Sequence, residues 1–180
     1  DAAPVPEGLT DSKALTPRRR EALVEPVRSW ALASSVGYAS AQEIDQWGII
    51  AALRLAGRRA LADVADRGLV PGGVLLDGSH NWLSAPDDLF GALDGPDDPF
   101  GRELPVHMQV KADASCAVVA AASVLAKVAR DHLMQGLDDP GYGWASNKGY
   151  GSAAHARAIG ELGVSDYHRR SWKMPTQATK

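Results

Sequence analysis

The feature that most constrains the fold is a short strand pattern joined through an acidic turn to a long helix of small residues. Residues 106–110 (VHMQV) follow Pro105 and read as a strand, and from Cys116 onward Ala, Ser and Val fill one helical face. Asp113 lies in the connection between them. At a strand's carboxyl end, a carboxylate can face a crevice and bind a cation or a phosphate-bound metal. Taken alone, this position fits a helix-capping acid better than a catalytic one, and both interpretations stay open.

A second aspartate occupies a similar place earlier in the chain. After Pro71, the apolar run GVLL leads directly into Asp77-Gly78, which puts Asp77 at the end of a second predicted strand. Two strand-end carboxylates are typical of Mg²⁺-dependent phosphoryl chemistry, because Mg²⁺ prefers hard oxygen ligands. Asp-Gly is also one of the commonest turn dipeptides, and a turn requires no metal. The residues alone favour the turn slightly.

Helices and strands are predicted to alternate with short connections, which favours an α/β layer fold. Residues 30–38 alternate as a strand does, residues 49–66 form an amphipathic helix, and residues 152–162 form another. The boundary signals are Thr16 and Pro17 at a helix start, Pro26 as its kink or end, Ser40 and Glu43 as a capping box, and Gly68 and Gly163 as stops.

Residues 142–151 form a predicted loop rich in glycine and aromatic residues. Its core is Asn147-Lys148-Gly149-Tyr150-Gly151. Gly149 would let a phosphate backbone approach closely, and Tyr150 could stack on a sugar or base. An equally good interpretation is a tight loop with Tyr150 packed on the core. We expect the tail from Val164 to be ordered only where it docks on the rest of the protein.

Length and composition point to one domain with a real core, since the chain has 180 residues of which 45% are hydrophobic. The single cysteine, Cys116, cannot form an internal disulfide. We predict a buried apolar filler in a protein of the reducing cytoplasm. No apolar run is long enough to cross a bilayer, and the start lacks the pattern of a signal peptide.

The net charge of −3 argues against a general affinity for nucleic acid, so local basic groups matter more. One such group is Arg18 to Arg20, and a second lies near the end of the chain at His168, Arg169, Arg170 and Lys173. Each is either a solvated face or a phosphate contact.

Six motifs occur in the order found in one family. They are Asp11-Ser12-Lys13, Leu76-Asp77-Gly78, Lys111-Ala112-Asp113, the AASVLAK helix that ends in Arg130-Asp131, Lys148-Gly149-Tyr150-Gly151, and His168-Arg169-Arg170-Ser171-Trp172. Together they cover nearly the whole chain, which resembles ribonuclease HII. The resemblance implies a ribonuclease H-like fold, a mixed β-sheet flanked by α-helices, forming a single catalytic domain over residues 1–180.

The resemblance also implies an activity. Such enzymes cleave the RNA strand of RNA–DNA hybrids and nick 5′ to single ribonucleotides embedded in duplex DNA, using Mg²⁺ or Mn²⁺. Water attacks the phosphorus in line and leaves a 3′-hydroxyl and a 5′-phosphate. The implied partners are these nucleic acids, with no membrane, and we expect a cytoplasmic monomer.

Individual roles follow from the matched motifs. Asp77 and Asp113 match metal-binding, catalytic carboxylates, and Tyr150 matches the tyrosine that stacks on the sugar of the nucleotide after the ribonucleotide. Phosphate contacts are expected from Ser12, Lys13 and Lys127, with helix capping or surface solvation as the alternative, and Gly149 shares the tyrosine loop. Asp131, beside Arg130, is expected to be an ion-paired structural acid.

The sequence departs from the family at its start. Members begin with a strand that carries an Asp-Glu pair followed by a Gly-Arg-Gly loop, and neither motif occurs here. These segments supply two of four active-site carboxylates and the groups that sense the ribose 2′-hydroxyl. We therefore expect the chain to lack its N-terminal strands. The alternatives are an inactive nucleic-acid-binding remnant and an unrelated α/β phosphoryl-transfer enzyme for a small molecule.

Overall fold

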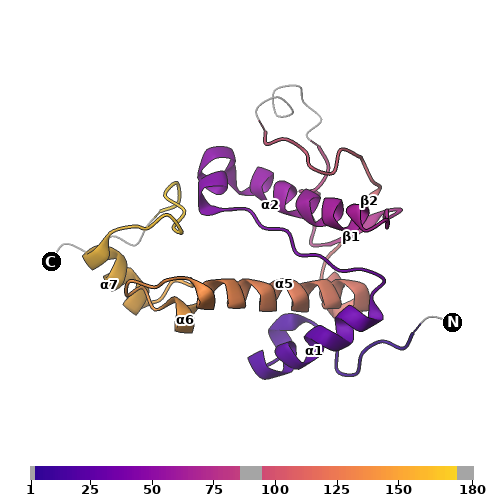
Figure 1. The fold of residues 1–180 in the computed structure, drawn as a ribbon, viewed down its shortest axis with the longest axis horizontal. Helices are drawn as coiled ribbons and strands as arrows, with labels where there is room; N and C mark the ends of the chain where they lie inside the picture. Colours follow the sequence, from indigo (N-terminus) through magenta and orange to yellow (C-terminus); the bar gives the residue numbers. More distant parts are fainter. Residues whose placement is uncertain (1–2, 86–94, 174–180) are drawn as a thin grey trace.

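The computed structural model describes residues 3–85 and 95–173 of the chain. Within these ranges the two strands follow one another, with helices before and after them, so the predicted alternation of helices and strands is not seen there (Figure 1). The elements are η1 (Ser12–Ala14), α1 (Pro17–Trp30), α2 (Ala41–Asp66), β1 (Val74–Asp77), β2 (Val106–Gln109), α4 (Ala112–Ser115), α5 (Ala117–Gly136), α6 (Trp144–Asn147) and α7 (Ala153–Leu162). No helix within these ranges is both long and apolar enough to cross a bilayer.

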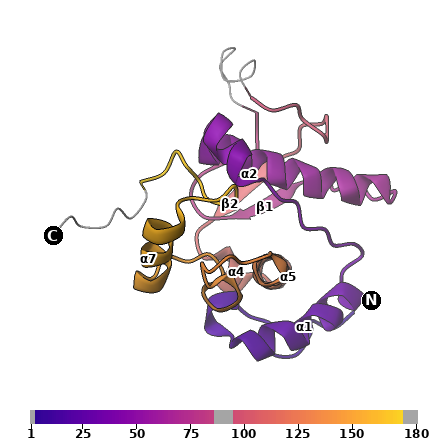
Figure 2. The ribbon, with the colours of Figure 1, turned by 60° about the vertical axis from the view of Figure 1, so that its left-hand side comes forward.

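Among the described residues, the sheet consists of two parallel strands. β1 and β2 pair in register, from Val74 with Val106 to Asp77 with Gln109. The carboxyl ends of both strands therefore lie at the same edge of the sheet. Figure 2 shows α2 on one side of the strands and α4, α5 and α1 on the other. The predictions of these two strands are confirmed, although β2 ends one residue before the predicted Val110.

Most helix boundaries agree with the capping signals. Thr16 and Ser40 cap α1 and α2 through their hydroxyl oxygens, and Glu43 completes the predicted capping box. The predicted helix over residues 49–66 is the longer part of α2, because Gly48 (φ 79°, ψ 167°) separates it from a first helical segment. α7 matches the predicted helix, with Gly163 at its end.

Three local predictions need correction. α1 continues past Pro26 to Trp30, so the proline does not end the helix, and a kink at this position stays a prediction. The predicted loop over residues 142–151 contains the short helix α6. Cys116 caps the start of α5 and is only half-buried, because it lies before the helix and not within its apolar face.

Apolar side chains join α1 to α5. Val27 of α1 is fully buried against Ala121 and Leu125 of α5, and Leu23 packs against Val124 one turn away. Small residues on α5 let the two helices approach closely, so the apolar face seen in the sequence is the face that forms the core.

The predicted strand over residues 30–38 is wrong. The chain leaves α1 at Trp30 and continues without regular structure until α2 begins. A strand needs a neighbour for its hydrogen bonds, and neither of the described strands pairs with this segment. It runs against α2 instead. An added Cβ on Gly37 would lie 1.9 Å from the carbonyl oxygen of Ala56, so only a glycine permits this approach.

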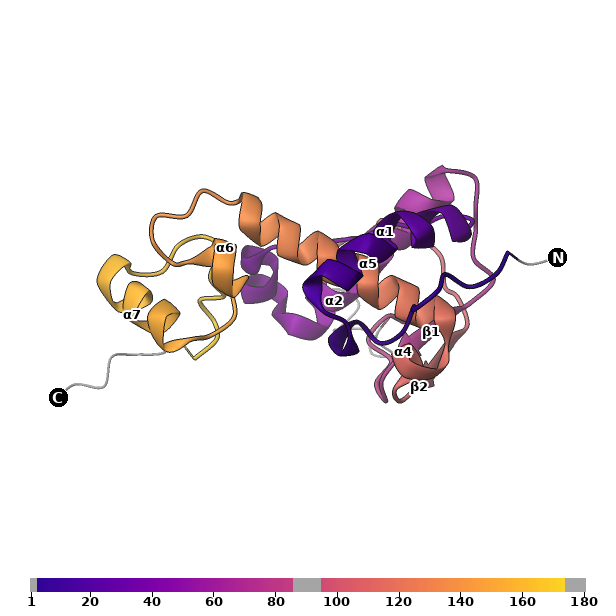
Figure 3. The same ribbon diagram turned by 90° about the horizontal axis from the view of Figure 1, so that it is seen from below.

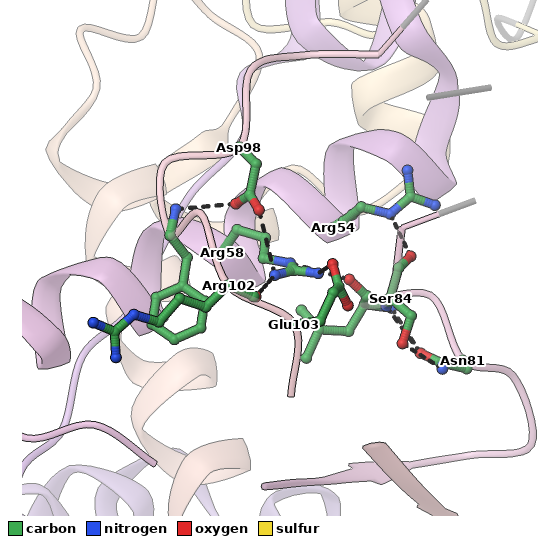
Figure 4. Close-up of polar contacts among 9 residues, drawn as sticks. Arg54, Arg58, Asn81, Ser84, Asp98, Arg102 and Glu103 are labelled. Carbon is green, nitrogen blue, oxygen red and sulfur yellow. Dashed lines mark hydrogen bonds and ion pairs between the residues drawn. The ribbon is translucent and has the colours of Figure 1, made fainter. Parts of the chain in front are cut away.

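A buried arginine on α2 holds the connection between β1 and β2 through ion pairs and hydrogen bonds (Figure 4). The side chain of Arg58 is 4% exposed and forms ion pairs with Asp98 Oδ2 at 3.3 Å and Glu103 Oε1 at 2.6 Å. Its guanidinium also donates to the main-chain oxygen of Leu83 at 3.2 Å and to that of Arg102. One cation therefore satisfies acceptors from two stretches of loop.

Arg58→Ala should lower the free energy of unfolding by about 2–4 kcal/mol, because it leaves buried carbonyl oxygens without a donor and removes both ion pairs. Equilibrium urea denaturation measures the change. The matched control is Arg67→Ala just after the end of the same helix, whose ion pair with Asp63 is exposed and should contribute less than about 1 kcal/mol. Equal losses in the two variants would show that burial of Arg58 adds nothing.

Candidate active site and nucleic-acid interface

The two predicted carboxylates come together at the carboxyl edge of the sheet. Asp77 is the last residue of β1 and Asp113 lies in α4, just after β2. The Oδ1 of Asp77 accepts the N–H of Ala112 at 2.9 Å. This bond ties the carboxylate of Asp77 to the main chain of the residue that precedes Asp113. Asp113 is 6% exposed.

The turn that presents Asp113 has an unusual backbone. Lys111 adopts the left-handed conformation, with φ 58° and ψ 37°, although it is not a glycine. The chain therefore turns sharply after β2 and enters α4 with Ala112 fully buried. Asp113 falls in the first turn of this short helix, where its carboxylate accepts no capping hydrogen bond. The helix-capping interpretation of Asp113 has no support in this geometry.

Lys13 supplies a positive charge beside Asp113. Its Nζ lies 3.6 Å from Asp113 Oδ2, and its side chain is 81% exposed. The short helix η1 that carries Lys13 is held by Arg20, which donates to the main-chain oxygens of Ser12 and Leu15 at 2.8 Å and 2.7 Å. The main chain of Lys13 is therefore held in place, with its ammonium group beside Asp113.

Ser12 lies next to Lys13 but faces the other way. It is buried, and its N–H donates to Ser123 Oγ of α5 at 3.4 Å. In this structure Ser12 forms part of the packing between η1 and α5, and its expected phosphate contact stays a prediction.

The donor set at the carboxylate pair fits a hard divalent cation. Mg²⁺ is commonly held by one or two carboxylates, with water and substrate phosphate completing its shell. Asp77 and Asp113 supply that number. Within residues 3–85 and 95–173, no group of three or more His, Cys, Asp or Glu side chains is placed to hold a metal. An ion bound here would therefore depend on water and phosphate for its remaining ligands.

Tyr150 lies on the surface of the predicted loop. The residue is 65% exposed, which contradicts the alternative in which it packs on the core. Gly149 beside it has φ 78°, and an added Cβ there would lie 2.9 Å from Met134 Cε and 3.3 Å from a guanidinium nitrogen of Arg130. Gly149 thus presses the loop against α5 and leaves Tyr150 pointing outward.

Lys127 of α5 lies over this ring, with its Nζ 5.5 Å from the ring centroid of Tyr150. The same ammonium group forms an ion pair with Asp131 one turn later. Asp131 is therefore an ion-paired acid, as predicted, and its partner is Lys127. The pair fixes the cation next to the exposed aromatic ring.

A basic hollow of about 430 Å³ continues from Tyr150. Four cations line it, together with the rings of Tyr150 and Trp172. These cations are Arg130, Lys148, Arg169 and Lys173. Burial and the neighbouring Arg169 lower the pKa of Arg130, and one of its terminal nitrogens is buried without a hydrogen-bond partner. The positive charge of the hollow and this unpaired donor therefore favour binding of an anion.

The segment that contributes Arg169 and Trp172 is anchored to α2. Asp45 accepts the N–H groups of Arg170 and Ser171 at 2.8 Å and 2.9 Å, and the hydroxyl of Ser171 at 2.6 Å. These bonds lower the pKa of Asp45. The sequence-based expectation that this tail is ordered by docking is met over its described part.

Arg130 was missed as an interface residue by the sequence reasoning. A usable signal was present, since Arg130 is three residues after Lys127 and four before Met134 and so shares a helical face with both.

The carboxylate pair and the basic hollow lie at different places along α5. Figure 3 shows α4 and the strands near one end of α5, and α6 and α7 near the other end. Roughly 15 Å of helix separates the start of α5 from Lys127.

Comparison with known proteins adds the family. The model of the family Ribonuclease HII matches residues 6–175. A ribonuclease HII of Streptomyces avermitilis is 44% identical over 169 residues, which cover 93% of this chain and 64% of that relative. A ribonuclease HII of Paracoccus denitrificans is 46% identical over 177 residues, covering 96% of this chain and 73% of that relative.

A solved structure supports the fold. The ribonuclease H2 of Pyrococcus horikoshii OT3 superimposes with a TM-score of 0.52 at 23% identity, over 93% of this chain and 78% of that one. The α/β, ribonuclease H-like fold is therefore confirmed. The chain spans 64% of the length of the Streptomyces relative. A family model matched along nearly the whole sequence and relatives above 40% identity lead to one conclusion: the chain belongs to the ribonuclease HII family.

Proposed function

We propose that this protein is a metal-dependent endoribonuclease that cleaves the RNA strand of RNA–DNA hybrids and nicks 5′ to single ribonucleotides in duplex DNA. The observation that carries the proposal is the pair Asp77 and Asp113, joined at one sheet edge with Lys13 beside it. Family membership supplies the substrate class. The products would be a 3′-hydroxyl and a 5′-phosphate.

Asp77 and Asp113 would hold Mg²⁺ or Mn²⁺, which when bound activates water and stabilises charge on the leaving oxygen. The N–H of Ala112 fixes one oxygen of Asp77. Lys13, 3.6 Å from Asp113, offers a positive charge to the phosphate that enters between them. The two carboxylates thus bind and orient the cation, and Lys13 neutralises part of the charge of the phosphate.

The separation of the two sites along α5 favours a polymeric substrate. The carboxylates lie before the start of α5, whereas Tyr150 and the basic hollow lie beside its second half. A nucleic acid can contact both, and a small molecule cannot span roughly 15 Å of helix. In this proposal Lys127 contacts the phosphate backbone beside Tyr150, and Gly149 allows that backbone to approach the loop.

A second candidate function is nucleic-acid binding without cleavage. It is favoured by the carboxylate count, because the described residues bring two carboxylates together and not a larger acidic group. The hollow lined by Arg130 and Arg169 would support binding in either case.

The direct test is a labelled DNA duplex with one ribonucleotide, incubated with Mn²⁺ or Mg²⁺, with EDTA as the control. A nick on the 5′ side of the ribonucleotide supports the proposed enzyme. Binding without a nick supports the second candidate. A chain that neither binds nor nicks at low salt would overturn both.

Tyr150→Ala should lower kcat/KM for the single-ribonucleotide duplex about 10- to 100-fold, because stacking on one aromatic ring contributes roughly 1–3 kcal/mol. The exposed ring makes few contacts that stabilise the fold, so the melting temperature should stay near that of the parent. Tyr150→Phe is the matched control and should retain the stacking. A Tyr150→Ala protein that nicks like the parent would remove the ring from the interface.

We also propose that the activity is cytoplasmic and belongs to a monomer. The free thiol of Cys116 suits a reducing compartment. Neither the strands nor the helices described above require a second copy to complete the carboxylate pair.

A further inference from the structure

Two buried histidines lie behind the Tyr150 loop and line the basic hollow, but the function proposed so far gives them no role. His155 belongs to α7, His168 belongs to the segment after it, and both are less than a tenth exposed. Their Nε2 atoms are 3.1 Å apart. A contact this short between two ring nitrogens requires one to donate and the other to accept.

The other ring nitrogens decide which one donates. His155 Nδ1 is 3.2 Å from the main-chain oxygen of Tyr150, which can only accept, so the proton of His155 sits on Nδ1. The N–H of Ser165 donates to His168 Nδ1 at 3.0 Å, so the proton of His168 sits on Nε2. The Nε2–H of His168 then donates to the bare Nε2 of His155. With both rings neutral, all four nitrogens are satisfied.

An added proton would disrupt this arrangement wherever it landed. On His155 Nε2 it would face the proton of His168 at 3.1 Å. On His168 Nδ1 it could donate to the hydroxyl oxygen of Ser165, 2.8 Å away, but it would also face the N–H of Ser165 at 3.0 Å, which would lose its acceptor. Either way one hydrogen bond becomes a contact between two donors, inside the protein, where it cannot be relieved by water.

The surroundings add to this effect. The rings of Tyr142 and Trp144 pack against the pair, and Tyr167 packs against Trp144. The charged residues that line the same hollow are all basic, namely Arg130, Lys148, Arg169 and Lys173. Of the acids near the pair in sequence, Glu161 is exposed, Asp139 accepts main-chain N–H groups and Asp166 pairs with Arg170. Burial and His155 lower the pKa of His168.

The pair connects two parts of the interface. His155 holds the main chain of Tyr150, and His168 directly precedes Arg169, whose guanidinium lies 4.4 Å from the ring centroid of Trp172. We propose that His155 and His168 are positioning residues that hold the Tyr150 loop against the Arg169–Trp172 segment, and that they do so only while both rings are neutral. The inference rests on the proposed function for its nucleic-acid ligand.

The sign of the pH effect separates this proposal from simple electrostatics. Histidines that merely add positive charge would strengthen nucleic-acid binding as pH falls. A pair that works only when neutral predicts weaker binding instead. A lowered folded-state pKa means that the unfolded chain binds the proton first, so the stabilisation is complete above the ordinary value of about 6.5 and is lost as pH falls below it.

The binding test uses anisotropy of a rhodamine-labelled RNA–DNA hybrid in EDTA, at constant ionic strength, from pH 7.5 to 5.5. We expect the affinity of the parent to fall about 3- to 10-fold over this range. His155→Gln/His168→Gln should abolish the fall, because amides do not titrate. The matched control His132→Gln, at an exposed histidine paired with Glu21, should keep it. A parent that binds more tightly at pH 5.5 overturns the proposal.

A second measurement needs neither a folded variant nor a nucleic acid. Nitrogen NMR of the imidazole rings of the full chain should show the Nδ1–H form for His155 and the Nε2–H form for His168. The amide signals of Tyr150 and Gly151 should shift with the midpoint at which the pair gains a proton. Two Nε2–H rings, or amides that ignore this midpoint, overturn the proposal. If the hybrid fails to bind at any pH while these signals behave as expected, the proposed function fails and the histidine pair stands.

Discussion

Asp113→Asn should reduce nicking of a ribonucleotide-containing duplex by about 10³-fold or more, a loss of roughly 4 kcal/mol of transition-state stabilisation. An asparagine has nearly the same shape but a weaker affinity for a divalent cation. The buried carboxylate has no capping role, so the fold should be retained. Asp77→Asn should lose activity to a similar extent. It should also keep the fold, since its amide oxygen can still accept the N–H of Ala112.

Single-turnover rates in Mn²⁺ measure the loss, and Mn²⁺ binding followed by electron paramagnetic resonance shows its cause. The matched control is Asp63→Asn, an exposed acid on α2 paired with Arg67, which should stay within about twofold of the parent. Hybrid binding in EDTA should be unchanged in all three variants. An Asp113→Asn enzyme with the parent's rate would show that the cation is held elsewhere.

Gly37→Ala should destabilise the fold by about 3 kcal/mol or more. The new methyl group would lie 1.9 Å from the carbonyl oxygen of Ala56 and 2.9 Å from the main-chain nitrogen of Ala60. Both atoms belong to the backbone of α2, which cannot move aside as a flexible side chain can. The segment after α1 would have to leave the helix.

Urea denaturation measures this change as well. Gly72→Ala is the matched control, because nothing lies within 4 Å of the Cβ that it adds. That variant should stay within about 0.5 kcal/mol of the parent. If Gly37→Ala is as stable as Gly72→Ala, the close approach of the segment to α2 does not exist in solution.

The successes of the sequence analysis came from local signals. The caps at Thr16 and Ser40 act within one turn, so the sequence next to them is sufficient to predict them. The pairing of Asp77 with Asp113 followed from two strand ends, since parallel strands put their carboxyl ends at the same edge.

The failures involve partners far away in the chain. Residues 30–38 have the alternation of a strand, but a strand also needs a neighbour, and that information is not local. Arg58 gave no signal, because its acceptors lie 25 to 45 residues further on. The contact between His155 and His168 depends on how a turn brings two segments together. Burial and long-range pairing are properties of the fold, so short windows of sequence do not contain them.

The hydrogen bonds that Asp45 accepts from the segment after α7 affect the order in which the protein assembles. Its partners Arg170 and Ser171 are made 125 and 126 residues after it. A ribosome therefore delivers α2 long before the segment that carries Arg169 and Trp172, and closing so long a loop is entropically unfavourable until the elements between are in place. The emerging chain would form its carboxylate pair first and the basic hollow, which we propose binds nucleic acid, last.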